Sequence, residues 1–157
     1  MGNNNDAFSN SAFEAIQYIN ERNYWLYQMA GELKRSVFPY DHKKNLHPPR
    51  ILETPFSCPG NIVLKLMAVS NNSDLSLHLI LMAGFILLLN KYTLNDDIIV
   101  GTPIYTEERA EHLSNKVLAI RQQFQEDSTF KELLLQVKDT IAKATENYAY
   151  PIEKLCE

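Results

Sequence analysis

LSLHLILMAGFILLLNKYTLNDDIIVG, residues 75–101, is the stretch of sequence that decides the fold. Every residue from Leu79 to Leu89 is apolar or glycine, so an α-helix there would be apolar on all sides and is expected to be buried. Asn95 to Asp97 then have the composition of a turn, and the β-branched run Ile98 to Val100 that of a strand. The stretch therefore predicts a buried helix, a turn and a central strand.

A membrane span is the alternative for this helix, and its length argues against it. At about 1.5 Å per residue, Leu75 to Leu89 would cover roughly 22 Å, whereas the hydrocarbon core of a bilayer is about 30 Å thick. Asp74 and His78 also lie at one end of the run and Lys91 at the other. We predict the core helix of a soluble protein, with no membrane partner.

Composition and charge limit the classes of protein to which the chain can belong. With 157 residues, 45% of them hydrophobic and 22% charged, the chain is expected to form one globular domain. The net charge of -4, with no extended basic cluster, argues against nucleic-acid binding. The polar residues 1–10 predict a disordered tail and no signal peptide, so we expect a cytoplasmic protein. Cys58 and Cys156 have no metal-ligand spacing, and we expect free thiols.

The first half of the chain predicts a helix and a hairpin around a loop. Apolar residues recur at helical spacing over residues 12–33, with Ser11 as the cap and an end near Ser36, as one long helix or two abutting ones. Residues 39–49 are rich in proline and histidine and predict a surface loop. Two strands, residues 50–57 and 61–69, then form a plausible hairpin.

The second half adds a strand and an amphipathic helix. Val117 to Ile120 predict a short strand closed by Arg121, and residues 129–144 carry apolar side chains at helical intervals, with Ser128 as the cap. Pro151 opens a short helical turn over residues 152–156. The order of elements predicts a mixed α/β sandwich.

The residues alone do not assemble an active site. His42 and His47 stand in the proline-rich loop without cysteine or carboxylate at ligand spacing, and His112 stands in a polar connector. His78 is expected to be a helix-end residue whose ring has a hydrogen-bond partner. The sequence contains neither a G-x-S-x-G nor a catalytic Cys-His signature, and no glycine-rich phosphate loop. We therefore predict no catalytic, cofactor-binding or metal-binding residue.

Five motifs, however, follow one another in a recognisable order. They are YWL with AGEL over residues 24–33 and the Pro-Tyr-Asp turn at 39–41, then LMAGF to NKYT over 81–93, DDIIVGTP over 96–103, FKELL over 130–134, and YPIEKL over 150–155. In this order they resemble the C-terminal lobe of a condensation domain of nonribosomal peptide synthetases, in the chloramphenicol-acetyltransferase-like superfamily. DDIIVGTP is the most specific of them, and together the motifs cover residues 22–157.

The resemblance implies a fold and a set of structural residues. The fold is α/β, a mixed β-sheet with flanking helices that forms a single lobe of a chloramphenicol-acetyltransferase-like domain over residues 11–157, a partial condensation domain. The family motifs are carried by eight residues to which we assign structural roles. These are Tyr24, Trp25, Asp97, Gly101, Pro103, Arg121, Pro151 and Glu153.

Several departures from the family pattern concern the chemistry. The family's HHxxxDG motif belongs to the other lobe, and this sequence has no adjacent histidine pair. Of the family's VNT-x-x-x-R segment only the Arg121 end is retained. Asn147, Tyr148 and Ala149 stand at the family's His-Gln-Asp positions. We predict that this part is not catalytic by itself and that it binds no cofactor.

Three functions follow as hypotheses from this resemblance. In the first, an inactive lobe of a synthetase of antibiotic or peptide biosynthesis serves as a structural platform for an adjacent adenylation domain in the same multidomain chain. In the second, it is one lobe of a working condensation domain that forms peptide bonds between thioesters on phosphopantetheine carriers. In the third, a free-standing module binds carrier proteins or self-associates through its exposed inter-lobe face.

Overall fold

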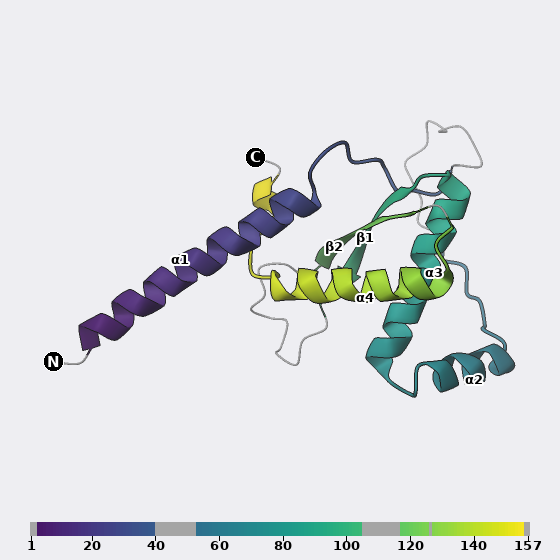
Figure 1. The fold of residues 1–157 in the computed structure, drawn as a ribbon. Helices are drawn as coiled ribbons and strands as arrows, with labels where there is room; N and C mark the ends of the chain where they lie inside the picture. The colour runs from purple at the N-terminus through teal and green to yellow at the C-terminus, as the bar shows by residue number, and fades with distance from the viewer. Residues whose placement is uncertain (1–2, 40–52, 105–116, 126, 156–157) are drawn as a thin grey trace.

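The computed structural model describes residues 3–39, 53–104, 117–125 and 127–155 of the chain. Its elements in order are α1 (Asn3–Gln28), α2 (Gly60–Val69), α3 (Asp74–Thr93), β1 (Asp97–Pro103), β2 (Val117–Gln123), α4 (Phe130–Glu146) and the 3₁₀ helix η2 (Ile152–Leu155) (Figure 1). The mixed α/β class predicted from the sequence is confirmed.

The two strands form an antiparallel ladder that organises the body of the molecule. Pairing runs from Asp97 opposite Gln123 to Pro103 opposite Val117. The packing helices α3 and α4 contact the ladder and each other (Figure 1). Alternate strand residues point into this core, as the period of two requires. The buried strand residues are Ile98, Val100, Thr102, Leu118, Ile120 and Gln122.

Helix α3 lies where the sequence predicts it, but only one side of it is buried. Its buried residues are Leu79, Ala83, Ile86 and Leu89, a stripe at helical spacing. On the opposite side Leu81, Phe85 and Leu88 are 53%, 44% and 45% exposed. The expectation of a helix buried all round is therefore wrong for the described residues. By length and composition α3 could cross a membrane, a property that buried core helices share, and here it packs on β1 and α4.

Helix α1 begins earlier and ends earlier than the sequence suggests. It starts at Asn3, so Ser11 is not its cap and the polar residues 3–10 continue the helix instead of forming the expected tail. Extending an existing helix adds one hydrogen bond for each residue fixed, so a polar segment next to a formed helix can become helical as well. The helix ends at Gln28 and not near Ser36, because Gly31 takes the left-handed conformation with φ of 83°.

The predicted hairpin over residues 50–69 is wrong. Residues 60–69 form the helix α2, and residues 53–59 have no regular structure. Almost every residue from Ile62 to Val69 is apolar, and such a run fits a strand or a helix equally well by periodicity. The Pro59 carbonyl accepts hydrogen bonds from the amides of Ile62 and Val63 and so starts the helix.

The C-terminal elements follow the prediction closely. The strand predicted at residues 117–120 continues to Gln123. Helix α4 is capped by Thr129 and not by Ser128, and the turn after Pro151 is the 3₁₀ helix η2. Cys58 is an exposed free thiol as expected. The predictions for the proline-rich loop with His42 and His47, for the connector with His112 and for Cys156 fall outside the described residues.

Candidate functional site

The motif residues Asp97 and Arg121 meet across the two strands and clasp the end of α1. The Arg121 guanidinium contacts the Asp97 carboxylate through Nε and Nη2, at 2.8 Å to Oδ1 and 2.6 Å to Oδ2. Its Nη1 donates to the carbonyls of Gln28 and Ala30, at 3.1 and 2.6 Å. Both charged side chains are largely buried, at 10% and 15% exposure. Hydrogen bonding to Asp97 raises the pKa of Arg121 above its usual value.

Trp25 joins α1 to the end of α4. Its ring is completely buried, and its Nε1 donates to the carbonyl of Asn147 at 2.7 Å. Tyr24 packs edge-on against it, with ring centroids 4.9 Å apart. Burial, reinforced by the carboxylates of Asp139 and Glu146, raises the pKa of Tyr24 from 10.0 to about 12. This motif pair therefore fixes the C-terminal part of α1 on the body.

Gly101 and Pro103 shape the second half of β1. A Cβ atom on Gly101 would lie 2.8 Å from Cγ1 of Val117 on β2, so any larger residue at this position displaces the Val117 side chain. Pro103 is the last residue of β1 and pairs with Val117. Proline at a strand end leaves no ladder donor missing from the middle of the sheet.

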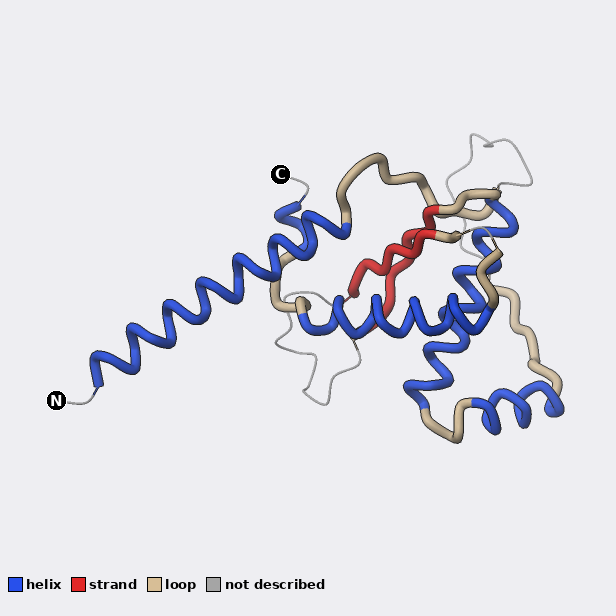
Figure 2. Tube along the Cα trace, in the orientation of Figure 1, coloured by secondary structure: helices blue, strands red, loops and turns tan. Residues whose placement is uncertain are grey.

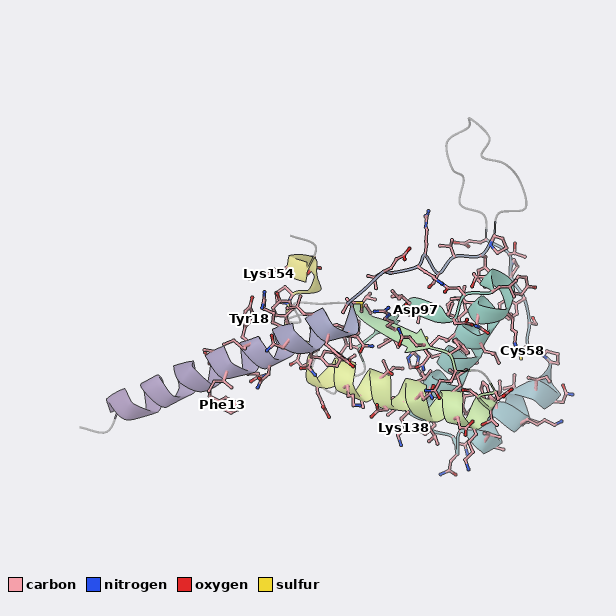
Figure 3. The ribbon with its side chains drawn as sticks, turned by 45° about the horizontal axis from the view of Figure 1, so that its top comes forward. Phe13, Tyr18, Cys58, Asp97, Lys138 and Lys154 are labelled. Carbon is pink, nitrogen blue, oxygen red and sulfur yellow. The ribbon has the colours of Figure 1, made fainter. Side chains whose placement is uncertain are left out.

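Pro151 and Glu153 lie in the C-terminal turn, which packs beside α1. The Pro151 carbonyl accepts from the amide of Lys154 at 3.2 Å, while Glu153 is exposed. Lys154 in turn donates to the Tyr18 hydroxyl at 3.3 Å, and Figure 3 shows the two side chains next to each other. The turn brings the end of the described chain back to the middle of α1.

His78 is placed as predicted, at a helix end with a hydrogen-bond partner. Its Nε2 lies 2.9 Å from Oγ1 of the buried Thr102 on β1. This pair ties α3 to the strand. Within the described ranges no group of three or more histidine, cysteine or acidic side chains is arranged to hold a metal ion.

The structure thus brings most of the motif residues together as contacts between elements. Asp97 on β1 meets Arg121 on β2, Trp25 on α1 reaches the Asn147 carbonyl at the end of α4, and Gly101 and Pro103 face the start of β2. Tyr24 packs on Trp25 within α1. The carbonyls that receive Arg121, the aromatic cluster of Phe38 with Phe85 and Tyr92, and the Thr102 partner of His78 were not foreseen. Of these, only the first had a signal in the sequence, since Gly31 marks the end of a helix whose last carbonyls need donors.

Comparison with known proteins agrees with the resemblance read from the motifs. The family model described as "Condensation domain" matches residues 9–157. Bacitracin synthase 1 of Bacillus licheniformis is 31% identical over 156 residues, which are 96% of this chain and 3% of that protein. Tyrocidine synthase 3 of Brevibacillus parabrevis is 30% identical over 165 residues, covering 96% of this chain and 2% of that protein.

A solved structure shares the fold. A mutant of the starter condensation domain of the rhizomide synthetase superposes with a TM-score of 0.56 at 14% sequence identity. The match covers 94% of this chain and 33% of the other. This chain therefore spans about a third of that solved structure and a few per cent of the matched synthases.

Proposed function

The chain belongs to the condensation-domain family of nonribosomal peptide synthetases, and we propose that it acts there as a non-catalytic, condensation-like lobe that supports an adjacent adenylation domain. The observation that carries the proposal is the use made of the retained motif residues. The polar groups of Arg121, Asp97 and Trp25 form hydrogen bonds that join elements of the lobe to each other. These contacts preserve a rigid body, which is what a platform needs.

The sequence supports the non-catalytic part of the proposal. General acid–base chemistry needs a titratable side chain held within hydrogen-bond reach of the reacting group. The chain has no adjacent histidine pair, and the His78 ring is engaged with Thr102. Asn147, at a family motif position, donates its side-chain amide to the main-chain carbonyl of Lys143 at 2.8 Å, and its main-chain carbonyl accepts from Trp25. The polar atoms at these two positions therefore serve the packing of the lobe.

The platform role is tested by producing the neighbouring adenylation domain with and without this chain attached. We expect the attached form to be more soluble and to unfold at a higher temperature, with faster aminoacyl-adenylate formation measured by ATP–pyrophosphate exchange. The attached Arg121→Ala variant should lose part of this gain, because it loosens the lobe. Lys138→Ala, on the exposed side of α4, serves as the matched control. Identical solubility, stability and exchange rates for both forms would refute the proposal.

A second function is favoured by the apolar stripe on α3. Leu81, Phe85 and Leu88 remain about half exposed on one side of the central helix. A surface of this kind is typical of an interface. The alternative is therefore that this chain is one lobe of a working condensation domain, which forms peptide bonds between carrier-bound thioesters. In that arrangement a second lobe supplies the HHxxxDG histidine.

This alternative is tested by adding an HHxxxDG-bearing N-terminal lobe of the family in trans. Co-elution of the two lobes and amide-bond formation between aminoacyl carriers would support it, and the Phe85→Glu variant should abolish both. The alternative would be refuted if the two lobes form no complex at micromolar concentrations although circular dichroism shows that both are folded. The hypothesis of a free-standing carrier-binding module is tested by titrating a loaded carrier protein against this chain alone. Binding without a second lobe or an adenylation domain would favour that hypothesis over the other two.

A further inference from the structure

One side of α1 carries an apolar seam whose large side chains remain about half exposed. Ile16, Ile19, Asn23 and Leu26 are spaced by three, four and three residues. This is the alternation of a and d positions in a coiled coil. The side chains of Ile16, Ile19 and Leu26 are 59%, 55% and 44% exposed. We call these four residues the α1 seam.

The seam faces away from the residues that hold α1 to the body. Trp25 and Glu21 are buried, and both lie beside the end of α4, where Trp25 donates to the Asn147 carbonyl and Glu21 lines a hollow with Glu146. At about 100° per residue, their positions lie on the opposite side of the helix from the seam. Figures 1 and 2 show that the N-terminal half of α1 extends away from the strands and the packing helices, whereas the seam lies in the C-terminal half, which meets the body. A second helix would therefore approach the seam from the side opposite Trp25 and Glu21.

We propose that the α1 seam binds the α1 seam of a second copy of this chain, as a short parallel helix pair. The seam is complementary to itself in this register. Ile16 at an a position and Leu26 at a d position follow the pattern of two-stranded pairing, although Ile19 at a d position does not, and a single asparagine at an a position fixes register and strand number. Asn23 is the polar a residue, and two copies of it would meet between layers formed by Ile19 and Leu26.

The flanking residues agree with a parallel pair. Arg22 lies at a g position and Tyr27 at the e position that follows it, so Arg22 of one copy would reach the Tyr27 ring of the other. A guanidinium over an aromatic face is attractive. The acidic residues Glu14 and Glu21 fall at f positions, outside the seam. Like charges do not oppose each other across this interface.

The size of the seam sets the strength of the association. Phe13 and Tyr27 are 68% and 83% exposed and flank the seam residues, so five large apolar side chains are available. If each buries on the order of 100 Å², both copies together bury about 1,000 Å². This is the lower end of specific interfaces. We therefore expect a reversible dimer that dissociates on dilution, independently of any role beside an adenylation domain.

Sedimentation equilibrium of the whole chain over a wide concentration range tests the proposal. We expect a monomer–dimer equilibrium, and a dimer dissociation constant at least tenfold higher for Ile19→Glu. Leu135→Glu on α4 is the matched control, because Leu135 has the same 55% exposure as Ile19. Asn23→Ile should strengthen association, which keeps the test informative if Ile19→Glu loses helicity. A monomer at all concentrations would overturn the proposal, as would equal effects of the two glutamate variants.

Cross-linking determines the orientation and the face. In a background with Cys58→Ser and Cys156→Ser, Asn23→Cys should form a disulfide-linked dimer under mild oxidation, because a parallel pair places the two a positions together. Leu135→Cys in the same background should remain monomeric. Association that persists in Ile19→Glu and is lost in Phe85→Glu would place the interface on α3 and overturn the proposal.

Discussion

The Arg121 side chain joins three segments that are distant in the sequence. It pairs with Asp97 on β1 and donates to two carbonyls at the end of α1, while it belongs to β2. Arg121→Ala leaves a largely buried carboxylate without its cation. Removing one partner of a buried ion pair is expected to cost about 3 kcal/mol of unfolding free energy. Urea denaturation followed by circular dichroism measures this change.

The control for this prediction is the exposed ion pair on α4. Lys143 and Asp139 are also 2.6 Å apart, but their side chains are 58% and 61% exposed. Lys143→Ala is therefore expected to leave the unfolding free energy almost unchanged. Equal losses in Arg121→Ala and Lys143→Ala would contradict the assignment of Arg121 as a clasp between elements.

Gly101 is the position where one added methyl group meets the neighbouring strand. The Cβ of Gly101→Ala would lie 2.8 Å from Cγ1 of Val117, which is 55% exposed and can turn away at some cost. We expect Gly101→Ala to lower the unfolding free energy by about 1 kcal/mol. The Gly101→Ala/Val117→Ala double variant should recover most of that loss. A double-mutant cycle in urea gives the coupling, and purely additive losses would exclude this contact as the cause.

Tyr24 makes the stability of the lobe sensitive to alkaline pH. Its pKa is about 12 in the folded chain, against the usual 10.0. Between these values the unfolded chain has released the proton that the folded chain retains, so stability falls as the pH rises through this window. Tyr24→Phe should flatten the fall between pH 10 and 12, and Tyr27→Phe, at an exposed ring, should not. The measurement is the melting temperature of the original chain and of Tyr24→Phe at each pH in this range. The two plots of melting temperature against pH would be parallel if Tyr24 had no such role.

At the scale of single elements, the start of α4 is the most closely defined feature. Thr129 accepts from the amide of Glu132, whose carboxylate returns a contact to the Thr129 amide, a complete capping box. Thr129→Ala should cost about 1 kcal/mol of unfolding free energy. Ser128→Ala, at the cap proposed from the sequence, should change it by less than about 0.5 kcal/mol. Chemical denaturation measures both losses. A larger loss for Ser128→Ala than for Thr129→Ala would place the cap at Ser128.

Elements with one dominant local signal were predictable from the sequence. The β-branched run of β1 ends at Gly101 and Pro103, and α4 spaces its apolar residues at helical intervals, so neither needs information from the rest of the chain. Helix α2 was not predictable in this way, because a run that is apolar at almost every position has no informative period. No residue of α2 is buried, so the core does not select its conformation either.

The contacts of the motif residues were not predictable from the sequence. The motif order pointed to Asp97, Arg121 and Trp25, and the structure shows each in a contact between elements. The partners of Arg121 and Trp25 include main-chain carbonyls of Ala30 and Asn147. Main-chain acceptors are present at every residue, so a sequence pattern does not mark which one a donor will reach.

At the scale of the whole molecule, the two apolar sides of α3 have different neighbours. The stripe with Leu89 faces the strands and α4, whereas the stripe with Leu81 and Leu88 faces outward. A soluble helix normally has one apolar stripe. The second stripe is unexplained by the body itself, and it is the surface that distinguishes a platform lobe from one half of a two-lobed domain.

Adjacent leucines on α3 provide a direct measurement of this difference. Leu89→Ala removes a side chain that is 3% exposed, and we expect a loss of about 2–5 kcal/mol in unfolding free energy. Leu88→Lys changes a side chain that is 45% exposed, and its effect on the isolated chain should stay below about 1 kcal/mol, because the lysine stem can lie along the apolar surface with its charge in water. If a second lobe covers this stripe, the cost of Leu88→Lys appears only in the complex, as weaker co-elution with that lobe. A large loss from Leu88→Lys in the chain alone would show that the outward stripe is already covered.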